Sequence, residues 1–176
     1  MKKTILGIII VMGVILVSGC ISNDSNNTDE PKTFSANGVF FKYPGQWDIA
    51  KSTVDGTIAA VADPASKNNL TGFAGTTVVV EKQNLTMSFN QFYNETYSKL
   101  FSNPDYELIS EGNLTIGDYN ASECVYSINS AEAKQCKAVW IQKDQEVYVI
   151  LFTTSKGKYE SQEKYLNYIL STFKLN

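Results

Sequence analysis

The segment Glu146–Thr154 constrains the fold of this 176-residue chain more than any other feature of its sequence. Apolar side chains fill both alternating sets of positions, with Val147, Val149 and Leu151 in one set and Tyr148, Ile150 and Phe152 in the other. Successive side chains of a strand point to opposite faces of a sheet, so this strand needs cover on both faces. The sequence therefore predicts a central strand between two covering layers.

Other segments have the alternating or β-branched pattern of strands. These segments are 38–43, 48–51, 57–62, 75–82, 107–116, 119–128 and 134–143. Strands that are joined by short polar turns must be antiparallel, and this applies to the last three segments and to the central strand.

Two helices are predicted, one before and one after this run of strands. Ser88 and Gln91 form a capping box, Met87 and Phe92 occupy hydrophobic-staple positions, and Pro104 predicts the end of the first helix. The second helix is predicted over 159–175. The predicted buried faces are Phe89, Phe92, Tyr93, Leu100 and Phe101 in the first helix, and Leu166, Ile169, Leu170 and Phe173 in the second. The class is α+β, an antiparallel sheet flanked by helices.

The chain contains neither histidine nor arginine. Its 15 basic residues are all lysine, and 18 acidic residues give a net charge of −3. Without histidine there is no Ser-His-Asp or Cys-His pair and no His-containing zinc site. Without arginine there is no guanidinium clamp for phosphate, and a mildly acidic surface disfavours nucleic acid. We therefore predict no catalytic residue, no metal site and no cofactor.

Residues 1–19 have the pattern of an export signal, with a charged start at Lys2 and Lys3 and an apolar run from Ile5 to Val17. As a helix this run would be about 20 Å long, which is short against a hydrocarbon core of about 30 Å. A single-pass membrane anchor is the alternative interpretation.

The stretch Val17-Ser18-Gly19-Cys20 resembles the lipobox of prokaryotic lipoproteins. In that family the cysteine becomes the mature N-terminus and carries lipid on its thiol. The resemblance implies lipidation of Cys20, and the positive start of the chain places the remainder outside the cytoplasm. We therefore expect a lipid anchor at the extracytoplasmic face of the cell membrane.

Residues 20–33 are predicted to be the lipidated cysteine and a flexible tether, because the stretch 22–31 is polar throughout and cannot repay its ordering entropy by burial. Residues 34–176 are predicted to form one domain, since the length suits a single domain and no internal repeat is present.

Seven Asn-x-Ser/Thr sequons support export, because such sequons are glycosylated on the surface of secreted proteins. They begin at Asn23, Asn26, Asn69, Asn84, Asn94, Asn113 and Asn120. An Asn-rich and Thr-rich composition is the alternative explanation. A lipobox, many sequons and no arginine are together similar to archaeal surface proteins.

The sequence Gly38-Val39-Phe40-Phe41-Lys42-Tyr43-Pro44-Gly45-Gln46-Trp47 resembles the opening of PsbP-like domains. These domains begin with an aromatic strand that runs into Tyr-Pro and then Trp, and the later order of elements is also similar. The resemblance covers residues 34–176. It implies an α-β-α sandwich around a central antiparallel sheet and an accessory role at membrane complexes. The metal sites proposed for plant members use histidine, so no functional residue carries over to this chain.

Cys124 and Cys136 are predicted to face each other across the hairpin formed by 119–128 and 134–143. With the turn centred at Ser130, the two cysteines pair directly and come within the range of a disulfide. Export permits the bond, so we predict a structural disulfide. Two buried free thiols are the alternative, and two thiols alone make a poor zinc site.

Three functions are open at this point. The first is a non-catalytic, lipid-anchored module that binds a membrane or envelope protein. The second is a lipoprotein that binds a small ligand or a glycan, because the 21 aromatic residues could form such a surface. The third is a carboxylate-dependent hydrolase, which would need two facing acids. The candidate aspartates lie near predicted turns, at Asp48, Asp55, Asp63, Asp105, Asp118 and Asp144.

Overall fold

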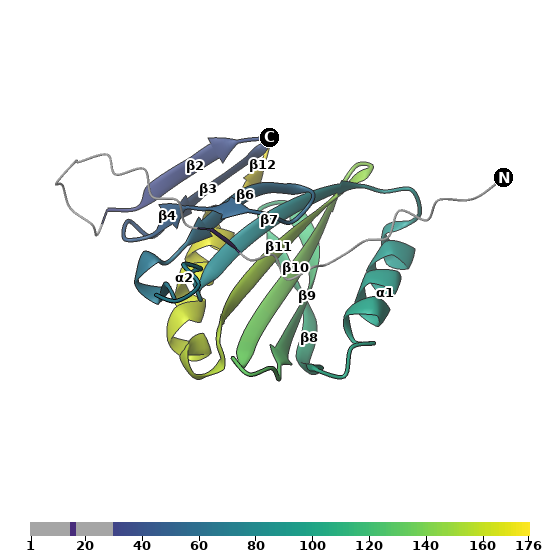
Figure 1. Ribbon diagram of the computed structural model, residues 1–176. Helices are drawn as coiled ribbons and strands as arrows, with labels where there is room; N and C mark the ends of the chain where they lie inside the picture. The colour runs from purple at the N-terminus through teal and green to yellow at the C-terminus, as the bar shows by residue number, and fades with distance from the viewer. Residues whose placement is uncertain (1–14, 17–29) are drawn as a thin grey trace.

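A seven-stranded antiparallel sheet forms the centre of the computed structural model, which describes residues 15–16 and 30–176 (Figure 1). The strand order is β4-β6-β7-β11-β10-β9-β8. The bounds are β4 (Asp48–Ile49), β6 (Thr57–Ala62), β7 (Thr77–Asn84), β8 (Tyr106–Ile116), β9 (Tyr119–Ile128), β10 (Lys134–Lys143) and β11 (Glu146–Ser155). Three strands lie on each side of β11, which confirms its predicted central position.

Shorter elements complete the described part of the fold. A three-stranded sheet has the order β12-β3-β2, and a separate two-stranded pair joins β1 to β5. These elements are β1 (Ile15–Leu16), β2 (Lys32–Ala36), β3 (Val39–Tyr43), β5 (Lys51–Ser52) and β12 (Lys174–Leu175). The helices are α1 (Phe89–Leu100), α2 (Tyr159–Thr172) and two 3-10 turns, η1 (Pro64–Ser66) and η2 (Lys156–Lys158).

The start of α1 is set by the predicted cap. The Ser88 side-chain oxygen accepts a hydrogen bond from the backbone N–H of Gln91 at 3.3 Å. This bond satisfies one of the backbone donors that a helix leaves free at its first turn. The helix then ends at Leu100, ahead of Pro104, as the sequence predicts.

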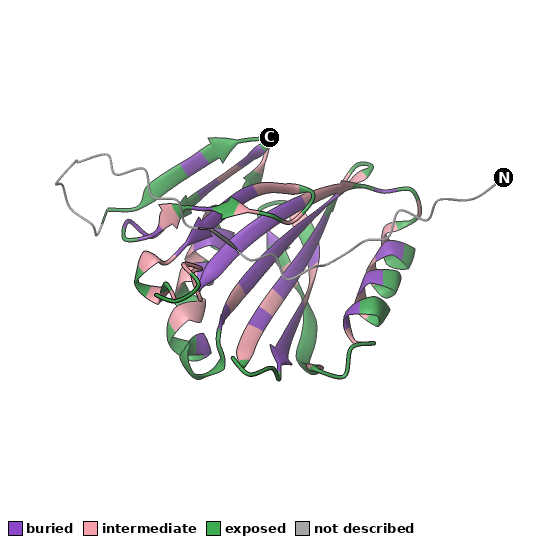
Figure 2. Ribbon diagram, viewed as in Figure 1, coloured by how far each residue is buried: buried purple, intermediate pink, exposed green. Residues whose placement is uncertain are grey.

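The two helices cover opposite faces of the large sheet, as the alternation along β11 predicts. Tyr148, Ile150 and Phe152 belong to the core on the α2 side. Val147, Val149 and Leu151 belong to the core on the α1 side. The fold is therefore an α-β-α sandwich with a central antiparallel sheet. Figure 2 shows buried residues along the middle strands of the sheet and exposed residues on the outer surface of α1.

The α2 side is closed by α2 and the three-stranded sheet together. Phe41 of β3 stacks on Phe34 of β2 and on Phe173, with ring centroids 5.1 and 6.1 Å apart. The indole of Trp47, which follows the Tyr-Pro motif, lies 5.6 Å from the ring of Tyr165 in α2. The aromatic opening strand thus belongs to a separate small sheet over the α2 side.

The C-terminal helix is shorter than its predicted range of 159–175. It ends at Thr172, whose side-chain oxygen accepts a hydrogen bond from the backbone N–H of Lys42 at 2.9 Å. Lys174 and Leu175 then pair with β3 as β12. Lys174 and Leu175 are not helical because they form backbone pairs with the edge of β3 that β2 does not occupy.

The N-terminal boundary also differs from the prediction. Strand β2 begins at Lys32, so two residues of the predicted tether 20–33 belong to the domain. The predicted signal 1–19 lies outside the described residues except for Ile15–Leu16, which form β1. Cys20 also lies outside them. Among the helices of the described part, none is long and apolar enough to cross a membrane.

Candidate functional site

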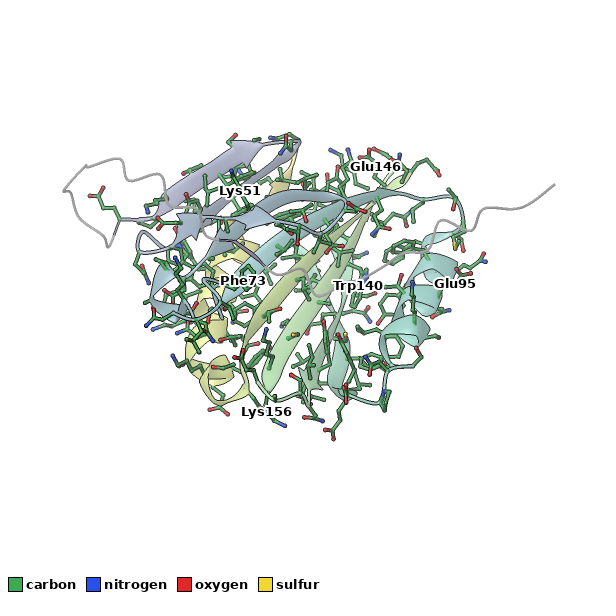
Figure 3. All side chains as sticks on the ribbon, in the orientation of Figure 1. Lys51, Phe73, Glu95, Trp140, Glu146 and Lys156 are labelled. Atoms are coloured by element: carbon green, nitrogen blue, oxygen red, sulfur yellow. The ribbon has the colours of Figure 1, made fainter. Side chains whose placement is uncertain are left out.

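Helix α1 packs over only one half of its side of the sheet. The ring of Tyr93 meets the indole of Trp140 on β10 edge-on, with centroids 5.1 Å apart. Phe101 meets Tyr126 on β9 in the same way at 5.9 Å. Figure 3 shows Trp140 between the sheet and α1, while Glu95 lies on the outer side of the helix. The predicted aromatic stripe of α1 is therefore a core contact.

Cys124 and Cys136 lie beneath this contact as free, buried thiols. The predicted disulfide is wrong because the register of the hairpin differs from the predicted one. Cys124 lies opposite Ala138, and Cys136 lies opposite Tyr126. The turn is centred one residue later than Ser130, and this shift places the two thiols diagonally on one face instead of directly opposite each other.

The two thiols are poorly suited to chemistry. Burial raises the pKa of the Cys124 thiol to about 12 and that of Cys136 to about 11. The sulfur of Cys136 lies 3.5 Å from the hydroxyl of Thr153. Because the thiolate is the nucleophile and the metal ligand, thiols with such raised pKa values are inert at neutral pH.

The other half of the α1 side is lined by small residues on β6, β7 and the segment just before β5. We call this set, formed by Ala50, Ala60, Ala62 and Val79, the alanine patch. Each of its side chains is at most 8% exposed. Ala74 packs against it, whereas the aromatic contacts of α1 are with β9 and β10 (Figure 1).

Glu81 lies on the same face of β7, two residues beyond Val79. It is 2% exposed. Its neighbours across the sheet are Thr57 on β6 and Val149 on β11. Desolvation raises the pKa of this carboxyl to about 7. Burial of an ionised carboxylate is costly, so the position favours the protonated acid.

The α2 side holds an ionised cluster at the junction of β9, β10 and α2. The Lys137 ammonium lies 2.8 Å from a Glu123 oxygen and 3.7 Å from a Glu163 oxygen. The hydroxyl of Tyr159 donates to Glu163 at 3.2 Å, and burial is the main cause that raises the pKa of this tyrosine. One lysine thus bridges a carboxylate on β9 and a carboxylate on α2, and this contact joins α2 to the sheet.

Two of the aspartates predicted at turns have side-chain contacts that stabilise local structure. Asp48 forms an ion pair with Lys32 at 3.0 Å, and Asp63 accepts a hydrogen bond from the backbone N–H of Ala65 at the start of η1. Across the described ranges, no group of three or more metal-ligating side chains comes together.

The five sequons within the described ranges have exposed asparagines. These are Asn69, Asn84, Asn94, Asn113 and Asn120. Asn23 and Asn26 lie outside the described residues. Exposure is what glycosylation requires, and the modification itself stays a prediction.

One surface hollow of about 360 Å³ lies where β8 meets β9. It is lined by Asn113, Leu114, Thr115 and Asn120. Sugar-binding sites usually stack an aromatic ring on the sugar, and none of the four lining residues is aromatic. This hollow gives no support to the glycan-binding alternative.

A family model described as PsbP-like protein matches residues 8–175. The chain belongs to the PsbP-like family. The resemblance that Gly38–Trp47 predicted is thereby confirmed. A comparison with curated protein sequences found no match to this PsbP-like chain.

Solved structures agree with this PsbP-like assignment at the level of fold. The cyanobacterial PsbP (CyanoP) of Synechocystis sp. PCC 6803 has a TM-score of 0.62 and 12% identity, over 91% of this chain and 99% of that one. LpqN of Mycobacterium tuberculosis, described as involved in cell envelope biogenesis, has a TM-score of 0.61 and 9% identity, over 84% and 91%. The protein of unknown function PA94 of Pseudomonas aeruginosa has a TM-score of 0.52 and 12% identity, over 81% and 94%.

The sequence analysis did not single out the alanine patch or Glu81. A signal was present, because Glu81 directly follows Val78-Val79-Val80 in a strand that is apolar on both faces. An acid at such a position is unusual, because charged residues are rarely fully buried unless they are paired.

Proposed function

We propose that the mature protein is a non-catalytic PsbP-like module, lipid-anchored at the extracytoplasmic face of the cell membrane, that binds a membrane or envelope protein. The observation that carries this proposal is the lipobox Val17-Ser18-Gly19-Cys20 at the end of the apolar run. Removal of residues 1–19 would leave Cys20 as the lipid-bearing N-terminus.

The position of the first strand of the domain supports an anchored arrangement. Strand β2 begins at Lys32, so the segment after Cys20 separates the lipid from the domain. Twelve residues span at most about 40 Å when fully extended. The domain would therefore act close to the membrane surface, within reach of membrane proteins and their extracytoplasmic parts.

Family membership and one structural neighbour support the setting. PsbP-like membership fits an accessory role, and LpqN is described as involved in cell envelope biogenesis. The exposed sequons fit a glycosylated surface protein. The structural role of the Lys137 ion pairs and the inert thiols fit a module whose function is binding.

Mass spectrometry of the protein purified from membranes tests the anchor. The expected N-terminal peptide begins at Cys20 and carries a lipid mass on it. Cys20→Ala should abolish the lipid and release the protein from the membrane, whereas Cys124→Ala and Cys136→Ala are matched controls that keep the lipid. An intact Met1 with no lipid would contradict the proposal.

Crosslinking in intact cells followed by purification tests the binding role. A membrane or envelope protein recovered in near-equal amount with the wild-type protein is the expected result. A monomer that carries only a small molecule would favour the ligand-binding alternative.

A further inference from the structure

The loop that connects β6 to β7 holds one complete sequon outside the packed surface of the domain. This sequon is Asn69-Leu70-Thr71, and all three of its residues are exposed. Leu70, at its middle position, is 97% exposed. Phe73 of the same loop is labelled in Figure 3. The sequon therefore protrudes from the domain as a whole.

Hydrogen bonds at the base of the loop hold this shape. The backbone N–H of Asn68 donates to the oxygen of Phe73, and the N–H of Gly72 donates to the oxygen of Asn68, both at 2.8 Å. The side-chain oxygen of Asn68 accepts from the N–H groups of Leu70 and Thr71 at 2.8 and 3.2 Å. An asparagine that bonds the backbone two residues further on is a typical turn former. The sequon therefore lies at the tip of a turn that closes on either side of it.

The other four sequons in the described ranges each contain a second or third residue that is buried or packs against a core. These packed residues are Leu85, Thr96, Leu114 and Ala121, in the sequons that begin at Asn84, Asn94, Asn113 and Asn120. Thr96, for example, is 2% exposed in α1, and its hydroxyl oxygen is buried. Such a tripeptide can leave the surface only if part of the domain unfolds.

Glycosylation requires access to the complete tripeptide, because the motif includes a hydroxyl two residues after the asparagine. In the reaction, the side-chain nitrogen of the asparagine forms a bond to the first carbon of a sugar. The bond between that carbon and the phosphate of a lipid-linked glycan breaks, the phosphate oxygen keeps the electron pair, and the amide loses a proton. A folded domain exposes the four packed tripeptides only after local unfolding, whereas it exposes 69–71 directly.

We propose that Asn69 is the glycosylation site of the folded domain and that its glycan covers the side chain of Leu70. The proposal rests on the proposed function in one respect, the export of the domain to the side of the membrane where glycans are attached. The structure distinguishes Asn69 from the other four described sequons, which the sequence pattern alone does not rank. A glycan bonded to Asn69 lies next to Leu70, because the two residues are adjacent in the turn.

Glycopeptide mass spectrometry of the protein, purified from the membranes of the cells that naturally make it, tests the site. We expect a glycan on the peptide that contains Asn69 and unmodified peptides for the other four described sequons. An unmodified Asn69 would overturn the proposal. A glycan at any of the other four would overturn it as well. At Asn94, for example, Thr96 would have been reached before the domain folded, and the folded structure would then not select the site.

Substitutions at the third position of a sequon give matched variants. Thr71→Val removes the hydroxyl, keeps the branched shape of the side chain, and should remove the whole glycan mass from the protein. Thr71→Ser keeps the hydroxyl and should retain the glycan. Thr115→Val, at an exposed position in the sequon of Asn113, should leave the glycan mass unchanged. Urea denaturation shows that each variant is folded. A glycan retained in Thr71→Val, or lost in Thr115→Val, would overturn the proposal.

Hydrophobic-interaction chromatography tests whether the glycan covers Leu70. Leu70→Ser keeps the sequon, and it should leave the retention of the glycosylated protein unchanged. In the Asn69→Gln protein, which has no glycan on this loop, the same Leu70→Ser change should shorten the retention, because the leucine is uncovered there. Equal shortening in both proteins would overturn the covering role of the glycan.

The N-terminal lipid is measured on a different peptide of the same sample. A lipid on Cys20 without a glycan on Asn69 would overturn this proposal alone. A glycan on Asn69 without a lipid on Cys20 would overturn the lipid anchor alone. Failure of the glycosylation site and failure of the anchor therefore give different mass spectra.

Discussion

The two faces of the central sheet are covered to different extents. On the α2 side, a helix and a three-stranded sheet together close the core over all the middle strands. On the α1 side, one helix with an aromatic stripe shares a core with β9, β10 and β11, and Ala74 packs against the separate alanine patch. Both faces of β11 are equally apolar, so the difference arises from what packs on each face. A single apolar sheet can thus be covered by different elements on its two faces.

The largest expected effect is on the α2 side. Leu166→Ala, at a fully buried position in α2, should lower the free energy of unfolding by about 4 kcal/mol, since it leaves a cavity in a closed core. The matched variant Leu100→Ala, at a 7% exposed position in α1, should cost only about 2 kcal/mol, because that side can relax. Urea denaturation measures both variants, and equal losses would contradict the difference between the faces.

The next largest effect is the pH dependence of stability that arises from Glu81. Its pKa is raised from 4.5 to about 7, so the folded state keeps a proton that the unfolded state loses between these values. The free energy of unfolding should therefore fall as the pH rises through this window, by about 3 kcal/mol at most, and be level above it.

Denaturation of the full-length chain at a series of pH values measures this slope. Glu81→Gln should remove the fall between pH 4.5 and about 7. Glu95→Gln, at an exposed position on α1, is the matched control and should keep it. Parallel profiles of the wild type and Glu81→Gln across this window would show that burial does not raise the pKa of Glu81.

A smaller effect is expected at the start of α1. Ser88→Ala removes the side-chain acceptor of the N-cap and should cost about 1 kcal/mol in urea denaturation. Ser98→Ala, at an exposed position within the same helix, should change the free energy of unfolding by far less. Equal effects of the two variants would mean that the cap does not hold α1 in place.

The smallest expected effect is that of a reductant. Cys124 and Cys136 are free, so dithiothreitol should leave the urea midpoint of the protein unchanged. A disulfide that closed a loop of this size would contribute about 3 kcal/mol, and its reduction would shift the midpoint clearly. Such a shift would restore the disulfide and the hairpin register that the sequence predicted.

The sequence predicted most of the local structure. Strands 57–62, 119–128 and 134–143 have the predicted bounds, because alternation of side chains and turn residues are local signals. The cap at Ser88 is equally local. The family could also be predicted from Gly38–Trp47. The hairpin register could not, because a turn one residue longer or shorter than expected changes which residues face each other.

The candidate site depended on tertiary structure for a related reason. Glu81 and Ala60 are separated in sequence and lie on one face of the sheet only because β6 and β7 pair, with Ala60 opposite Val79 and Thr57 opposite Glu81. The small sheet of β2, β3 and β12 joins the two ends of the described domain, which no local pattern predicts.

By itself, the sequence predicted an export signal with a lipobox, excluded histidine and arginine chemistry, and determined an apolar central strand that needs a cover on each face. Only the tertiary structure decided which elements pack against each face of the sheet. The alternation of apolar residues along a strand predicts that a face is apolar. Burial of that face depends on which helix or sheet packs against it in the folded protein. α2 and the three-stranded sheet reach all of one face, and α1 reaches half of the other.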